Sequence, residues 1–141
     1  MTQAGQGQFI EVGIGDERYA IPIAEVHEII KTPGLTSIPG AREQLKGVLQ
    51  VRGQLIPVLC LRARFGYPET AYTKATRIVI VHYDGGRTGI IVDCVHRVTS
   101  YGRIQAPPPQ LGEADEAFFT GIGQRGEELV CLLKLDSVLQ G

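Results

Sequence analysis

The cysteines and histidines, the side chains most often used as thiol nucleophiles, neutral-pH bases and zinc ligands, number three each in this chain. Cys94 and His96 stand two residues apart, so on a β-strand they would point the same way and could form a nucleophile–base pair or part of a metal site. The sequence has no second pair of ligands at zinc spacing and no paired acid at a recognisable offset, which favours packing or rim positions. The glycine-bearing turns "GIGDER" and "GIGQRG" do not lie between a strand and a long helix, so neither is a phosphate cradle. We therefore expect no enzyme activity, no bound metal and no cofactor.

A further chemical group stands at the centre of "GVLQVRGQLIPV", residues 47–58, where an Arg-Gly pair interrupts two apolar runs. Gly53 permits the backbone to turn, and alternation along a strand places Arg52 on the same, wetter face as Gln50. Arg52 is then either a solvated turn residue or a side chain presented to a partner. A guanidinium group suits the second role because it can hold a carboxylate with two hydrogen bonds.

Length and charge limit the possible functions. The chain has 141 residues, enough for one compact domain or two small subdomains, and 14 Lys and Arg against 15 Asp and Glu give a net charge of −1. This balance argues against a general phosphate-binding surface, which needs a basic excess or stripe. There is no run of 18 apolar residues and no signal peptide in "MTQAGQGQF", so we expect a cytoplasmic protein that does not insert into a membrane. The odd number of cysteines and the missing secretion signal favour free thiols.

Many short apolar runs, separated by 18 glycines and eight prolines, predict an all-β barrel or sandwich. Strands are predicted at 9–14, 19–22, on both sides of the Arg-Gly turn as far as Leu61, and at 77–83, 88–98, 118–123 and 129–135. The segment at 77–83, "RIVIVHY", is apolar on both faces, as a strand buried on both sides would be. Pro57 cannot donate to a ladder, so its strand is expected to be an edge strand or bulged. We interpret Asp93 as structural, holding a turn or pairing with Arg97.

Two short helices are also predicted. Pro22 can open a helix, and "IAEVHEII" follows with apolar residues at three- and four-residue spacing, ending at "TPG" (32–34). The segment "DSVLQG" at the C-terminus predicts the second helix, with Asp136 as a possible cap. Residues 106–117 are expected to form a loop or a short helical turn.

The domain organisation follows from a faint repeat. "RGQLIPVLCLR" in the first half is similar to "RGEELVCLLKL" in the second, as two small barrels of similar build would be. We expect a flexible N-terminus at 1–8 and a single domain at 9–141, with the connection between the two barrels near 66–76.

The chain resembles the CheW-type coupling proteins of bacterial chemotaxis in four segments, in the family's order from about Phe9 to Leu139: "YAIPIAEVHEII", "IPGAREQLKGVLQVRGQLIPVLCLR", "TGIIVDCVHRV" and "GIGQRGEELVCLLKLDSVL". The most specific piece is similar to the family's Gly-(Val/Leu)-Ile-Asn-Leu-Arg-Gly-x-(Ile/Val)-Ile-Pro-Val segment. The second matches Gly-x-x-Val-Asp-x-Val at Gly89, Val92, Asp93 and Val95. This resemblance implies a mainly β fold of two small five-stranded SH3-like barrels packed together, with one short helix after the first hairpin and a short C-terminal helix. Three positions depart from the family pattern, where Asn, Asp and Asp are usual: Gln50, Cys60 and Lys134.

The same resemblance implies a non-catalytic signalling adaptor. It would couple the cytoplasmic tip of chemoreceptors to the regulatory domain of a CheA-type histidine kinase, in flagellar chemotaxis or a related pathway such as pilus motility. Matching motif positions place receptor binding at six residues: Arg52, Ile10, Ile23, Val26, Ile29 and Val95. The kinase-contacting residues are not identified. From spacing alone, the stripe from Ile23 to Ile29 is more typical of a core-facing surface.

The alternative is a nucleic-acid-binding small barrel. Five tyrosines and four phenylalanines could supply stacking platforms, but the near-neutral charge lacks the electrostatic funnel that such proteins use. We therefore expect no nucleic-acid partner.

Overall fold

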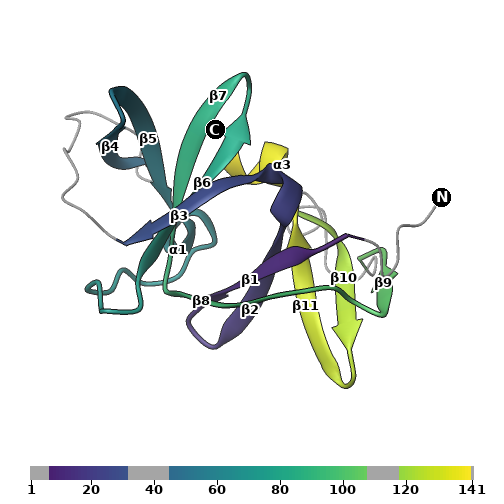
Figure 1. Ribbon diagram of the computed structural model, residues 1–141. Coiled ribbons are helices and arrows are strands. Elements are labelled where there is room, and N and C mark those ends of the chain that lie inside the picture. Colours follow the sequence, from purple (N-terminus) through teal and green to yellow (C-terminus); the bar gives the residue numbers. More distant parts are fainter. Residues whose placement is uncertain (1–6, 32–44, 108–117, 141) are drawn as a thin grey trace.

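The chain folds into two β-sheets, seen in a computed structural model that describes residues 7–31, 45–107 and 118–140 (Figure 1). One sheet has six strands in the order β8-β1-β2-β11-β10-β9: β1 (Phe9–Ile14), β2 (Glu17–Pro22), β8 (Cys94–Thr99), β9 (Arg103–Gln105), β10 (Phe119–Arg125) and β11 (Glu128–Leu133). The other has five strands in the order β3-β6-β7-β5-β4: β3 (Val26–Lys31), β4 (Leu45–Val51), β5 (Gln54–Cys60), β6 (Arg77–Tyr83) and β7 (Gly86–Val92). The expected mainly β fold of two barrel-like subdomains is confirmed.

Each sheet contains one parallel pair among antiparallel neighbours, β5 with β7 and β11 with β2. Strands β5 and β11 each follow an Arg-Gly pair, and each leads into a short helix, α1 (Leu61–Arg64) or α3 (Leu135–Leu139). The faint sequence repeat therefore marks the same turn–strand–helix unit in both sheets.

Buried apolar side chains form one cluster between the two sheets and one further cluster in each barrel-like subdomain. Residues from both sheets form the inter-sheet core, which we define by its fully buried members Val12, Ile14, Ile21, Val79, Val81 and Ile90 and their neighbours. Along β6, Val79 and Val81 face this core, whereas Ile78 and Ile80 point the other way, into the apolar cluster formed by the five-stranded sheet alone. All four side chains are fully buried, so the prediction that β6 is covered on both faces is confirmed.

The helix predicted at 23–30 is wrong beyond its first turn. A 3₁₀ turn, η1, covers Ile23–Glu25 only, and the chain then continues as strand β3. Val26 pairs with Val81 and Glu28 with Ile80, so His27 is an extra residue in the ladder, a β-bulge. The bulge lets Val26 and Ile29, three residues apart, both face the inter-sheet core, and this produces the helix-like spacing.

The single strand predicted at 88–98 is also divided. The chain leaves the five-stranded sheet at Val92, bends at Asp93 and enters the six-stranded sheet as β8. The other passage between the sheets is at η1. Segment 66–76 does not connect the two sheets, because the strands before and after it, β5 and β6, belong to the same sheet.

Two smaller expectations need correction. β5 is not an edge strand, since it lies between β7 and β4, and it is not bulged: the extra residue of the β4–β5 ladder is Lys46, on β4. Asp136 lies in the first turn of α3 rather than at its cap, which is Lys134. The expected flexible segment at 1–8 lies outside the described residues up to residue 6, as do the helix stop at 32–34 and residues 108–117 of the loop. Within the described ranges, no helix is long and apolar enough to span a bilayer.

Candidate functional site

Arg52 stands at the tip of the β4–β5 hairpin. Val51 pairs with Gln54, which leaves a two-residue loop of Arg52 and Gly53 with φ of +48° and +80°. Positive φ at both loop residues is the geometry of a type I′ turn, whose twist matches that of a hairpin. Arg52 adopts a left-handed conformation that disfavours a side chain, and 71% of its side chain is exposed.

The Arg52 guanidinium donates a hydrogen bond to the Glu28 carboxylate on β3. Strands β3 and β4 are the two edges of the five-stranded sheet, so this ion pair connects edges that do not pair through their backbones. The hydrogen bond from Arg52 lowers the pKa of Glu28, and the charges of His27 and Arg87 act in the same direction. The His27 Nε2 atom lies 3.4 Å from the same Glu28 oxygen that Arg52 contacts. Arg52, Glu28 and His27 therefore form a compact charged cluster around one carboxylate, which we call the Arg52 corner.

The five apolar residues implied by the resemblance do not form one open stripe. Ile10 is buried in the inter-sheet core, and Val26, Ile29 and Val95 pack against that core while remaining partly exposed. Ile23, on η1, is 38% exposed. The structure thus brings Val26, Ile29 and Val95 to one core at its rim. It leaves Ile10 with little surface for a partner.

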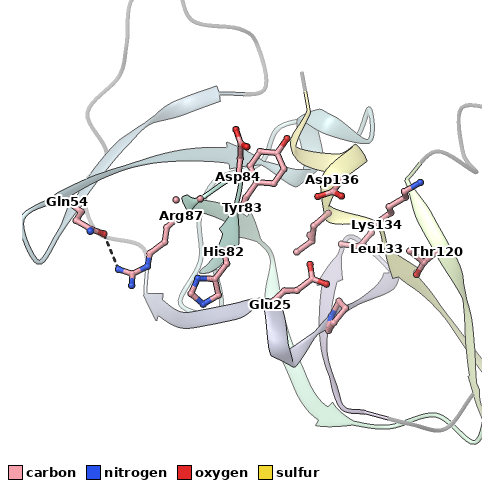
Figure 2. A pocket seen from close by; sticks show the side chains of 14 residues that line it. Glu25, Gln54, His82, Tyr83, Asp84, Arg87, Thr120, Leu133, Lys134 and Asp136 are labelled. Atoms are coloured by element: carbon pink, nitrogen blue, oxygen red, sulfur yellow. Dashed lines mark hydrogen bonds between the residues drawn. The ribbon is translucent and has the colours of Figure 1, made fainter. Parts of the chain in front are cut away.

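A cleft of ≈ 840 Å³ opens between the two sheets next to this corner (Figure 2). Its walls come from the β6–β7 turn, from Gln54 after the Arg52 turn, and from the β11–α3 junction. Figure 2 shows His82 and Arg87 on one side of the cleft and Glu25 and Asp136 on the other. Arg87 donates to the Gln54 side chain at 3.0 Å. Burial, together with the negative charge of Asp136, raises the pKa of Glu25.

Asp93 joins the two sheets. Its carboxylate accepts two hydrogen bonds from Arg62, at 2.9 and 2.7 Å, and one from the Gly15 backbone N–H at 2.8 Å. The hydrogen bonds from Arg62 lower the pKa of Asp93 against the opposing effect of burial. The structural interpretation of Asp93 is confirmed and it does hold a turn, but its ion-pair partner is Arg62 and not Arg97.

A buried charge at Glu11 was not apparent from the sequence. Its carboxylate accepts hydrogen bonds from the Tyr101 hydroxyl at 2.6 Å and from Arg125 at 2.5 and 3.3 Å. Arg97 and Arg18 lie 3.5 and 3.6 Å away. Alternation along β1 indicated only that Glu11 faces away from Ile10 and Val12. Its partners are 7 to 114 residues away in sequence, so no local spacing could reveal that this face is also covered.

Cys94 and His96 do lie together, with Sγ and Nε2 3.5 Å apart. Across the described ranges, no His, Cys, Asp or Glu joins them in a group of three that could hold a metal. Two of the residues that depart from the family pattern stand at the same position of a helix: Cys60 is the N-cap of α1 and Lys134 is the N-cap of α3. Neither makes a side-chain capping bond. An aspartate at each of these positions would supply one.

Comparison with known proteins agrees with this architecture. The sequence model of the CheW-like domain family matches residues 8–141 of this chain. The chain is 34% identical to the chemotaxis protein CheW of Helicobacter pylori over 94% of this chain and 81% of that protein, and 29% identical to the protein PilI of Pseudomonas aeruginosa over 79% and 64%. The crystal structure of the scaffolding protein TtCheW from Thermoanaerobacter tengcongensis superposes with a TM-score of 0.87 at 33% identity, covering 96% of this chain and 88% of that one.

The chain belongs to the CheW-like domain family. It is a coupling adaptor of the chemotaxis type. The relatives named above give no support to the nucleic-acid-binding alternative.

Proposed function

We propose that this adaptor works in the cytoplasm without catalysing a reaction, and couples the cytoplasmic tip of chemoreceptors to the regulatory domain of a CheA-type histidine kinase. The receptor would dock at the rim formed by Val26, Ile29 and Val95, with Ile23 beside it and Arg52 at its charged end. Ile10 would act from beneath, as part of the core that holds this rim. The kinase would use another surface, whose residues we do not assign.

The observation that carries the proposal is the Arg52 corner. A side chain that is 71% exposed is held in a left-handed turn conformation, and it is tied to the strand that carries Val26 and Ile29. A guanidinium with free donors beside partly exposed apolar side chains suits a helical partner that brings both an apolar face and an acidic or amide group.

The test is Arg52→Glu, compared with Arg103→Glu on β9 of the other sheet, which makes the same charge change at an exposed position. We expect Arg52→Glu to weaken binding to a receptor-tip fragment by roughly thirtyfold or more, because a charge-assisted contact is lost and repulsion is added. Binding to the kinase regulatory domain and the melting temperature should stay close to wild type, as they should for Arg103→Glu in all three assays.

The double variant Glu28→Arg, Arg52→Glu distinguishes two roles of Arg52: binding the receptor, and linking the edge strands β3 and β4 through its ion pair with Glu28. It restores an ion pair between β3 and the turn with the charges exchanged. If Arg52 faces the receptor, the double variant stays impaired. Recovery of wild-type receptor affinity would show that Arg52 only closes the edges, and the proposed receptor role would be rejected.

A further inference from the structure

Cys94 and His96 form an exposed pair on an edge strand. Among the described residues, β8 is the outermost strand of its sheet and pairs with β1 alone. Cys94 is half-buried and His96 is exposed, and the thiol sulfur lies 3.5 Å from the imidazole Nε2. Of the other two cysteines, Cys60 is buried, whereas Cys131 is half-buried like Cys94 but lies on β11, between β10 and β2, and has no histidine two residues along the strand.

The backbone around the pair is arranged to hold it. Glu11 of β1 pairs with Arg97 and Val12 pairs with Val95, so His96 is an extra residue, the bulge of strand β8. Gly13 lies opposite Cys94, and a Cβ added at Gly13 would come within 2.8 Å of both the Cys94 Sγ and the His96 Nε2. The two side chains therefore rest on the bare glycine backbone, and a side chain there would displace them.

From this geometry we propose that Cys94 is a reactive thiol activated by His96, and that it is a site of reversible modification by low-molecular-weight disulfides of the glutathione type. With its proton on Nδ1, the His96 ring presents Nε2 as an acceptor 3.5 Å from the Cys94 Sγ, placed to take up the thiol proton as the sulfur attacks. This inference is independent of the receptor-docking proposal, since it concerns a different strand and a different chemistry.

The reaction is a thiol–disulfide exchange. The Cys94 thiolate attacks one sulfur of the disulfide, a new S–S bond forms to Cys94, and the original S–S bond breaks. The second sulfur leaves as a thiolate and takes the proton held by His96. The disulfide itself is the oxidant, and a thiol in excess reverses the step.

The rate of reaction with 5,5′-dithiobis(2-nitrobenzoate) at pH 7 tests the proposal, with the modified residue identified by peptide mass spectrometry. The reference is the same chain unfolded in guanidinium chloride, where every thiol is exposed and unassisted. An ordinary thiol is about 3% thiolate at pH 7, so a neighbouring base that takes up the proton during attack can raise the rate by at most about thirtyfold. We expect Cys94 to react roughly fivefold or more faster in the folded protein than in the unfolded chain.

Four variants complete the design. Cys94→Ser should remove the fast phase, and His96→Ala and His96→Gln should return Cys94 to the unfolded-chain rate or below. His82→Ala, which changes another exposed imidazole on β6 of the other sheet, should leave the fast phase intact. Parallel incubation with glutathione disulfide should give one mixed disulfide, at Cys94. A folded-state rate for Cys94 no higher than the unfolded rate, or a fast phase that survives both His96 substitutions, would overturn the proposal.

Discussion

Glu11 provides the sharpest test of how the six-stranded sheet is stabilised. Its side chain is 0% exposed, although it is surrounded by charged groups. Burial alone would raise its pKa, but the hydrogen bonds from Arg125 and Tyr101 and the nearby guanidinium charges outweigh burial, so the pKa of Glu11 lies below its ordinary value. Glu11 is therefore ionised at neutral pH. Glu11→Gln keeps the size of the side chain and its ability to accept from Tyr101 while removing the charge.

The magnitude depends on what happens to the arginines. Removing one partner of a buried ion pair costs about 3–5 kcal/mol when the other charge is stranded away from water. Here the side chains of Arg125 and Arg97 are 25% and 47% exposed, so water can partly solvate them after the carboxylate is lost. We therefore expect Glu11→Gln to lower the free energy of unfolding by about 2–3 kcal/mol, out of roughly 5–15 kcal/mol for a typical domain.

Urea denaturation at pH 7 measures this difference. The matched control is Glu128→Gln, the same substitution at a carboxylate that is 48% exposed and lies 2.6 Å from Arg125. Because exposed ion pairs contribute little, the control should change the free energy of unfolding by less than about 1 kcal/mol. Equal effects of the two substitutions would show that burial of Glu11 does not set its contribution.

The pH dependence gives an independent check. The pKa of Glu11 is lower in the folded state than its ordinary value of 4.5, so its stabilising effect is complete above that value and is lost as the pH falls through the folded-state pKa. The gap in stability between wild type and Glu11→Gln should therefore narrow in acid. A gap of less than about 0.5 kcal/mol at pH 7 would refute the reasoning, because that is the range of ordinary surface substitutions.

Further predictions concern the core, the joint between the sheets and a helix cap. Val79→Asp places an unpaired charge at a fully buried position and should lower the free energy of unfolding by several kcal/mol, about 3 or more; a melt within a few degrees of wild type would contradict this. Asp93→Asn weakens the paired hydrogen bonds from Arg62 and should cost about 1–2 kcal/mol at pH 7, a difference that fades in acid because the pKa of Asp93 is lowered in the fold. Lys134→Asp supplies the missing N-cap of α3 and should raise the free energy of unfolding by about 1 kcal/mol in urea titrations, whereas Lys134→Ala should not.

Strand positions followed from the sequence wherever one local rule applied. Alternation located β1, and the doubly apolar segment at 77–83 located β6 as a strand covered on both sides. The Asp-Gly-Gly and Arg-Gly turns fixed the hairpins, because only a few residue types tolerate positive φ. These local patterns predicted an all-β barrel or sandwich, and the resemblance to the CheW-type proteins, carried largely by other segments, added the arrangement of two packed barrels.

The errors arose where the backbone departs from regular alternation. The bulge at His27 places Val26 and Ile29 on one face of a strand, and three-residue spacing on one face is otherwise a helical property. The bend at Asp93 moves the chain from one sheet to the other without a glycine or proline to mark it. The enclosure of Glu11 depends on Tyr101 and Arg125, which are 90 and 114 residues away, so only the tertiary structure reveals it.

The charged groups of this adaptor differ in how readily a partner could displace their contacts. A partner that competed for Arg125 would leave the Glu11 carboxylate buried without its main counter-charge, and one that competed for Arg62 would release Asp93 from the joint between the sheets. At the β4–β5 turn the cost is small, because water already reaches most of Arg52 and can replace it at Glu28. We therefore infer that Arg52 is the cation of these three that can exchange an internal contact for an external one without loss of the fold, and this supports the receptor-docking role proposed for the Arg52 corner.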